Sequence, residues 1–119
     1  MLRPYNAFTY SLEAAAKVLG AERKNFQEVT FTGITHKDSE VLPGDIFLAF
    51  PGSKVHGAEF IDRAKERGAV AVLTDAAGAE LSRDLPTLVV SNARGAGATL
   101  SSSFYRDPIR EMQSIGDRK

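Results

Sequence analysis

Residues 30–57 read TFTGITHKDSEVLPGDIFLAFPGSKVHG, and this stretch contains the pattern that decides the fold. Two apolar runs occur in it, and each is followed by a polar loop, residues 35–41 after the first run and 53–57 after the second. Loops that follow the strands of an α/β sheet are where ligands usually dock. The stretch therefore predicts a binding platform made of two strands and the loops that follow them.

Two Pro-Gly pairs enclose the second apolar run, at residues 43–44 and 51–52. Proline sets φ for the first central position of a turn, and glycine accepts the positive φ that a type II turn requires next. The pairs predict a strand over residues 45–50 with a turn at each end. Its apolar residues do not alternate with polar ones, which indicates a strand that is covered on both faces.

A helix is predicted over residues 58–67, because Phe60, Ile61 and Ala64 form one apolar stripe and Gly68 follows. A second apolar strand is predicted directly afterwards, over residues 70–74. Strand, helix and strand with such short connections indicate a βαβ unit, in which the two strands are parallel. We therefore expect an α/β fold: a single small domain with a mixed β-sheet and flanking helices.

The remaining segments give weaker patterns. Further strands are predicted at 29–35, 87–90 and 112–115, helices at 11–19 and 93–105, a polar connector at 21–28 and a helical turn at 79–83. The helix at 93–105 is expected to end before the Asp107-Pro108 pair, because the residue before a proline is biased away from the helical region.

Composition excludes several classes of protein. The chain has 119 residues, of which 43% are hydrophobic and 25% charged, and its fifteen Lys and Arg balance fifteen Asp and Glu. A neutral chain argues against nucleic acid as a partner, and no apolar run is long enough to span a membrane. Because there is no cysteine, disulfides and thiolate metal sites are excluded. These features predict a soluble cytoplasmic domain.

The two polar loops carry the candidate binding residues. The first offers hydroxyls, an imidazole and a carboxylate; the second leads into the N-terminus of the predicted helix, whose N–H groups favour a phosphate. Each loop could also be an ordinary surface turn in which side chains such as Asp38 and Ser39 cap the backbone. The second loop lacks the glycine spacing of a Walker loop. No nucleophile, base and orienting group can be named together, so no catalytic residue and no metal site is predicted.

Five pieces of the sequence, in order, resemble the N-terminal domain of the Mur ligases, specifically of the MurE type (UDP-N-acetylmuramoyl-tripeptide synthetase). They are TGITH at 32–36, PGDIFLA at 43–49, Gly52 followed by HGA at 56–58, GAVAVLTD at 68–75 and FYRDP at 104–108.

The resemblance implies that residues 1–119 form a UDP-substrate-binding domain, and that the central ATPase and C-terminal domains are absent from the chain. It implies no cofactor within the chain, with ATP and Mg²⁺ acting in the complete ligase, and it implies that the chain alone is inactive as a ligase. The expected partners are a UDP-linked muramoyl-peptide and, in cis, the central ATPase domain. Two alternatives are a MurF-type N-terminal domain and a free-standing scaffold that has lost nucleotide binding.

The resemblance also assigns UDP contacts to the two loops. The family's first loop usually reads Thr-x-Asp-Ser-Arg, whereas residues 35–40 read THKDSE, so either Asp38 or Ser39 fills the family's serine role and a glutamate replaces the arginine. The implied UDP-binding residues are Thr35, His36, Asp38, Ser39, Ser53, Lys54, Val55, His56 and Gly57.

Overall fold

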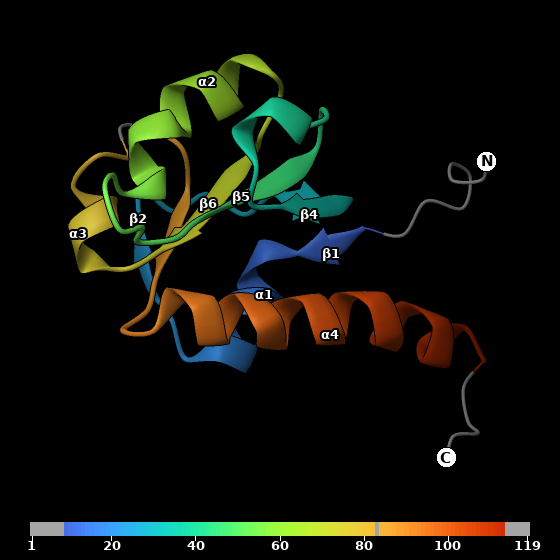
Figure 1. Ribbon diagram of the computed structural model, residues 1–119. Helices are drawn as coiled ribbons and strands as arrows, with labels where there is room; N and C mark the ends of the chain where they lie inside the picture. The colour runs from blue at the N-terminus through green and yellow to red at the C-terminus, as the bar shows by residue number, and fades with distance from the viewer. Residues whose placement is uncertain (1–8, 83, 114–119) are drawn as a thin grey trace.

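The computed structural model describes the backbone of residues 9–82 and 84–113 and the side chains as far as residue 104 (Figure 1). Its main sheet has five strands in the order β2-β7-β6-β5-β4. The strands are β2 (Glu22–Lys24), β4 (Gly33–Thr35), β5 (Asp45–Ala49), β6 (Ala71–Thr74) and β7 (Thr87–Val89). Strands β4 to β7 are parallel and β2 is antiparallel to β7. The predicted α/β fold with a mixed sheet is therefore confirmed.

Helices cover both faces of this sheet (Figure 1). On one face lie η2 (Gly57–Phe60) and α2 (Ile61–Glu66), and on the other lie α1 (Leu12–Leu19) and α4 (Ala93–Gln113). A hydrophobic cluster lies on each face of the sheet, and β5 contributes to both. Ile46 and Leu48 pack in the cluster that includes residues of α1 and α4, and Phe47 packs in the cluster that includes residues of α2. A strand buried on both faces explains why its sequence is continuously apolar.

The predicted βαβ unit is present. Strands β5 and β6 pair in parallel from Ile46↔Ala71 to Ala49↔Thr74, and every residue of both strands is buried. The turn before β5 is as predicted, since Gly44 has φ 94°. The helix between the strands differs in its first turn, which is the 3₁₀ helix η2. Gly57, the first residue of η2, donates its N–H to the Phe50 carbonyl at 2.7 Å.

Two predictions between residues 21 and 35 are wrong. The strand predicted at 29–35 is split into β3 (Thr30–Phe31), which pairs with β1 (Tyr10–Ser11) in a separate two-stranded sheet, and β4. The chain changes sheets at Thr32, whose N–H donates to the Gly44 carbonyl at 2.9 Å. The polar connector contains β2, an edge strand that pairs with β7. Edge strands are commonly charged, so β2 lacks the apolar pattern used to predict strands.

Three predictions nearer the C-terminus are also wrong. The helical turn is α3 (Ala76–Ala79), which starts earlier than predicted because the Asp75 side chain caps it by accepting from Gly78 N–H at 2.9 Å. Helix α4 continues through the Asp107-Pro108 pair to Gln113, since a proline removes one helical hydrogen bond without necessarily ending the helix. The strand predicted at 112–115 is thus helical at 112–113, and its other two residues lie outside the described residues.

In the part of the chain that the structure describes, no helix is both long and apolar enough to cross a membrane.

Candidate functional site

The two polar loops meet in one shallow cleft. Because β4 and β5 are parallel neighbours, residues 35–39 and residues 53–57, here called the first and second loops, leave the sheet at the same edge. The cleft between them, the loop cleft, has a volume of about 310 Å³. It is lined by His36, Lys37, Asp38, Ser39, Phe50, Val55, Gly57, Phe60 and Arg94.

Five of the predicted binding residues line the loop cleft: His36, Asp38, Ser39, Val55 and Gly57. The other four, Thr35, Ser53, Lys54 and His56, belong to the same loops but do not line it. Ser53 and Lys54 are exposed on the second loop beside Val55. The structure thus places both predicted loops at one cleft.

The first loop is held to helix α2 by an ion pair. Asp38 begins the 3₁₀ helix η1 (Asp38–Glu40), and its Oδ2 lies 3.4 Å from Nη1 of Arg63 in α2. Thr35 Oγ1 accepts from Lys37 N–H at 3.2 Å and shapes the start of the loop. Because the Asp38 carboxylate is engaged on one oxygen by Arg63, the Ser39 hydroxyl, which is exposed, is the freer of the two side chains to meet a ligand.

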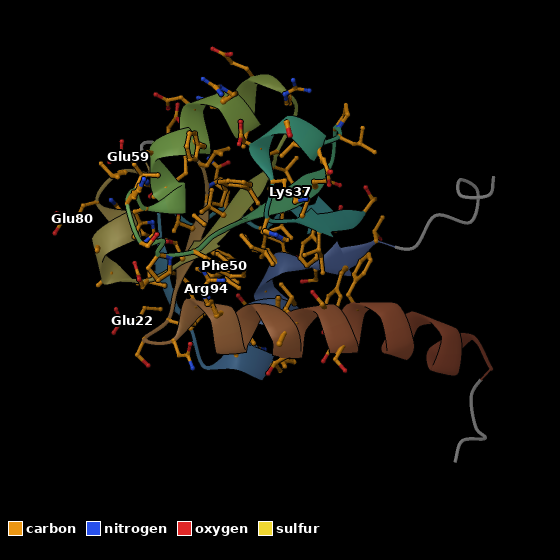
Figure 2. All side chains as sticks on the ribbon, viewed as in Figure 1. Glu22, Lys37, Phe50, Glu59, Glu80 and Arg94 are labelled. Atoms are coloured by element: carbon orange, nitrogen blue, oxygen red, sulfur yellow. The ribbon has the colours of Figure 1, made fainter. Side chains whose placement is uncertain are left out.

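Four lining residues were not among the predicted binding residues: Lys37, which lies within the first loop, and Phe50, Phe60 and Arg94. The His36 ring stacks against the Phe50 ring with centroids 5.9 Å apart, and the Arg94 guanidinium lies 5.1 Å from the Phe50 centroid. Arg94 also donates to the Pro51 carbonyl at 2.9 Å. Figure 2 shows Phe50 and Arg94 close together where β5 ends above the start of α4. Arg94 could have been found, because it follows β7, a parallel strand that ends at the same edge of the sheet.

Both ring nitrogens of His56, in the second loop, form hydrogen bonds within the protein. Its Nδ1 accepts from Ala58 N–H at 2.9 Å, so the ring proton is on Nε2, which donates to Asp75 Oδ1 at 2.8 Å. The same hydrogen bond occupies an N–H at the start of the helix that was expected to face a phosphate. A His56 ring protonated on both nitrogens could not accept from Ala58 N–H, so this geometry gives the start of the helix no positive charge from His56.

Asp75 is held in its ionised form. Partial burial would by itself raise the pKa of Asp75, but the hydrogen bonds from Gly78 N–H and the His56 ring outweigh burial and hold the pKa below the ordinary value of 3.8. A carboxylate with a lowered pKa stabilises the folded state above the unfolded pKa, and this stabilisation is lost as pH falls through the folded pKa.

This gives a pH-dependent prediction. We expect Asp75→Asn to be less stable than the wild type at neutral pH, and the difference to shrink as the pH is lowered below about 4, where the wild-type carboxyl becomes protonated. The measurement is the free energy of unfolding of both proteins in urea between about pH 7 and pH 2.5. Asp84→Asn, at an exposed carboxylate paired with Lys65, is the control. A wild-type advantage that stays constant down to the lowest pH would contradict the assignment.

Among the residues that the structure describes, no three His, Asp or Glu side chains are grouped so that they could hold a metal ion. The loop cleft is instead lined by the hydroxyl and backbone groups of the first loop, the aromatic rings of Phe50 and Phe60 and the cationic groups of Lys37 and Arg94. The fold and the cleft define an α/β domain with a cleft formed by its strand-end loops.

Comparison with known proteins identifies the family. A family profile described as "Mur ligase family, catalytic domain" matches residues 30–105. A UDP-N-acetylmuramoyl-L-alanyl-D-glutamate–2,6-diaminopimelate ligase from Streptomyces avermitilis is 40% identical over 116 residues, which are 96% of this chain and 23% of that protein. The UDP-N-acetylmuramyl-tripeptide synthetase of Deinococcus radiodurans is 35% identical over 105 residues, 88% of this chain and 21% of that protein. The chain belongs to the Mur ligase family.

The solved structures agree on the fold. A crystal structure of MurF from Acinetobacter baumannii superposes with a TM-score of 0.70 at 15% identity and covers 86% of this chain. At that identity the similarity shows the fold alone, whereas the sequence relatives are MurE-type ligases. These relatives confirm the resemblance to MurE-type Mur ligases found in the sequence. The chain spans about a fifth of the length of the curated relatives it matches.

Proposed function

We propose that the loop cleft binds the UDP moiety of a UDP-linked muramoyl-peptide, and that the chain acts as the N-terminal domain of a MurE-type ligase. The observation that carries this proposal is the parallel pairing of β4 and β5, which brings the two loops together in one cleft. The relatives support it, because their names describe ligases that act on UDP-N-acetylmuramoyl compounds. The specific substrate would be UDP-N-acetylmuramoyl-L-alanyl-D-glutamate.

The chemistry of the two loops suits the two parts of UDP. Uracil presents an N–H donor between two carbonyl acceptors, which the backbone and the Ser39 or Asp38 side chain of the first loop can match. The diphosphate carries negative charge. The side chains of Lys37 and Arg94, which line the cleft, and of Lys54, the residue before Val55 in the second loop, can offset this charge. In this arrangement the uracil lies at the first loop and the diphosphate between the second loop and the start of α4.

Amide-bond formation would take place outside this chain. ATP and Mg²⁺ would activate the substrate in the central ATPase domain of the complete ligase, joined in cis, and the chain itself would contribute binding alone. A cytoplasmic location is part of this proposal. The MurF-type alternative rests on similarity of fold, and the scaffold alternative rests on the altered first loop, so a binding experiment separates the scaffold from the other two.

Lys54→Ala tests the proposed diphosphate contact. One hydrogen bond to a charged group contributes roughly 1.5–3 kcal/mol, so the variant is expected to bind UDP about tenfold more weakly or worse. Its stability should change by less than about 0.5 kcal/mol, because Lys54 is exposed on a loop. The measurement is calorimetric titration with UDP.

The matched control for this experiment is Lys17→Ala, which removes an exposed lysine from α1 on the other face of the sheet. It should leave UDP affinity unchanged. If the two substitutions weaken binding equally, the effect is one of overall charge and Lys54 is not a contact. If the wild type shows no binding at millimolar UDP, the scaffold alternative is favoured.

A further inference from the structure

A chain of hydrogen bonds links the end of strand β6 to the second loop. Asp75, the residue after β6, accepts from His56 Nε2–H at 2.8 Å, and His56 Nδ1 accepts from Ala58 N–H at 2.9 Å. Both side chains are largely shielded from water, with relative exposures of 21% for Asp75 and 17% for His56. A carboxylate that accepts the ring N–H of a histidine fixes both the tautomer and the orientation of the ring.

The second loop depends on this link, since its remaining anchors are at its base. Gly57 N–H donates to the Phe50 carbonyl, and His56 forms an isolated bridge with Pro51. Between these anchors residues 52–55 are exposed. The position of the loop therefore follows from how the base is held: Arg94 links the base to α4 through the Pro51 carbonyl, and His56 links it to the residue after β6.

The packing around His56 leaves its ring little freedom. A Cβ atom added at Gly78 in α3 would lie 2.7 Å from Cε1 of the ring, so the imidazole is packed directly against this turn. Asp75 Oδ1 also accepts from Gly78 N–H at 2.9 Å. One carboxylate oxygen therefore fixes the α3 turn and the imidazole together, and the turn after β6 becomes the support of the loop after β5.

We propose that Asp75 is a positioning residue for UDP binding: through His56 it holds the second loop in the arrangement that forms the wall of the loop cleft. Asp75 itself does not line the loop cleft. It acts on the ligand by pre-organising a loop, which lowers the loss of freedom on binding. This inference rests on the proposed function, because it assumes that the ligand in the loop cleft is UDP.

Two substitutions break the link while keeping the local caps. In Asp75→Ser the hydroxyl can still cap α3, because serine and aspartate are comparable N-caps. The serine side chain is too short to reach His56 as well. In His56→Asn the side-chain oxygen can still accept from Ala58 N–H but cannot reach Asp75. Asp75→Asn keeps an acceptor oxygen at the right distance and serves as the conservative variant. Asp84→Ala removes an exposed carboxylate that pairs with Lys65 and serves as the control.

The test combines three measurements on the 119-residue chain: the ¹⁵N signals of the His56 ring, amide hydrogen exchange in residues 53–57, and titration with UDP. The wild type should show a ring protonated on Nε2 alone. Asp75→Ser and His56→Asn should each exchange faster in the second loop and bind UDP about threefold to tenfold more weakly. Because the two residues act as one unit, the double variant should bind no more weakly than either single variant. Asp75→Asn should recover most of the affinity, and Asp84→Ala should match the wild type.

The outcomes separate this inference from the proposed function. Faster exchange in the loop with unchanged UDP affinity would overturn the positioning role, and so would unchanged exchange in both single variants. Additive losses in the double variant would also overturn it. If the wild type does not bind UDP at all while the ring and exchange data show the link, the proposed function fails, and with it the role of Asp75 in UDP binding, although the link itself stands.

Discussion

Replacing Phe31 by alanine is expected to lower the free energy of unfolding by about 3–5 kcal/mol. The Phe31 side chain has no exposed surface, and its ring stacks on those of Tyr10 and Phe104 with centroids 5.4 and 5.7 Å apart. These three residues come from β3, β1 and α4, so Phe31 joins the two-stranded sheet and the long helix to the core. The substitution removes a large buried surface and leaves a cavity that the surrounding elements cannot fill.

Denaturation in urea, followed by circular dichroism, measures the Phe31→Ala effect. Because a loss of this size approaches the total stability of a small domain, Phe31→Leu is the second variant, with a smaller loss expected. The control is Val18→Ala, at a side chain that is 52% exposed on α1, which should change stability by less than about 0.5 kcal/mol. Equal effects at residues 18 and 31 would contradict the core described here.

Gly57→Ala is expected to destabilise the chain by about 1–3 kcal/mol and to weaken UDP binding by about tenfold or more. A Cβ atom at this position would lie 2.9 Å from both the nitrogen and the oxygen of Phe50 and 3.3 Å from Ala49 Cα. All three are backbone atoms of a strand or its end, so the second loop has to move instead. The movement would break the Gly57–Phe50 hydrogen bond and displace the wall of the loop cleft.

The matched control for Gly57→Ala is Gly95→Ala. Its added Cβ would meet the side-chain end of Asn92, not backbone, although the Asn92 Oδ1 also accepts from Gly95 N–H at 3.1 Å. Alanine is favoured over glycine inside a helix, which offsets a weakened cap, so Gly95→Ala is expected to change stability by less than about 1 kcal/mol. Urea denaturation and UDP titration of the two variants make the comparison. If Gly57→Ala binds UDP as tightly as Gly95→Ala does, then close approach at Gly57 does not shape the site.

The sequence was sufficient for the parts of the fold with a strong local pattern. The apolar run that became β5, the Pro-Gly turn before it and the stripe of Phe60, Ile61 and Ala64 are all signals within a few residues. The βαβ unit follows from them, and so does the expectation that the two loops lie at one edge of the sheet. Where the pattern was weak, the prediction was wrong: β2 is charged and short because it is an edge strand.

The composition of the cleft was harder to predict, because it depends on contacts between distant segments. Arg94 comes from the start of α4, 43 residues beyond the Pro51 carbonyl that it contacts. The resemblance implied His56 as a UDP-binding residue, and in the structure its ring pairs with Asp75, 19 residues away, while its Nδ1 accepts from Ala58 N–H. No spacing rule relates these pairs. They become visible only once the parallel order of β5, β6 and β7 places the ends of the three strands side by side.

The most direct test of the central claim is a titration of the ¹⁵N-labelled chain with UDP, followed by amide chemical shifts. If the loop cleft binds UDP, the shifts will be concentrated in residues 36–39, in residues 53–57 and around Arg94, and they will saturate. A second cleft of about 510 Å³ lies at the ends of β6 and β7, lined in part by Gly20, Glu22 and Val89. Shifts confined to that second cleft, or no shifts at millimolar UDP, would contradict the claim that the two loops form a UDP site.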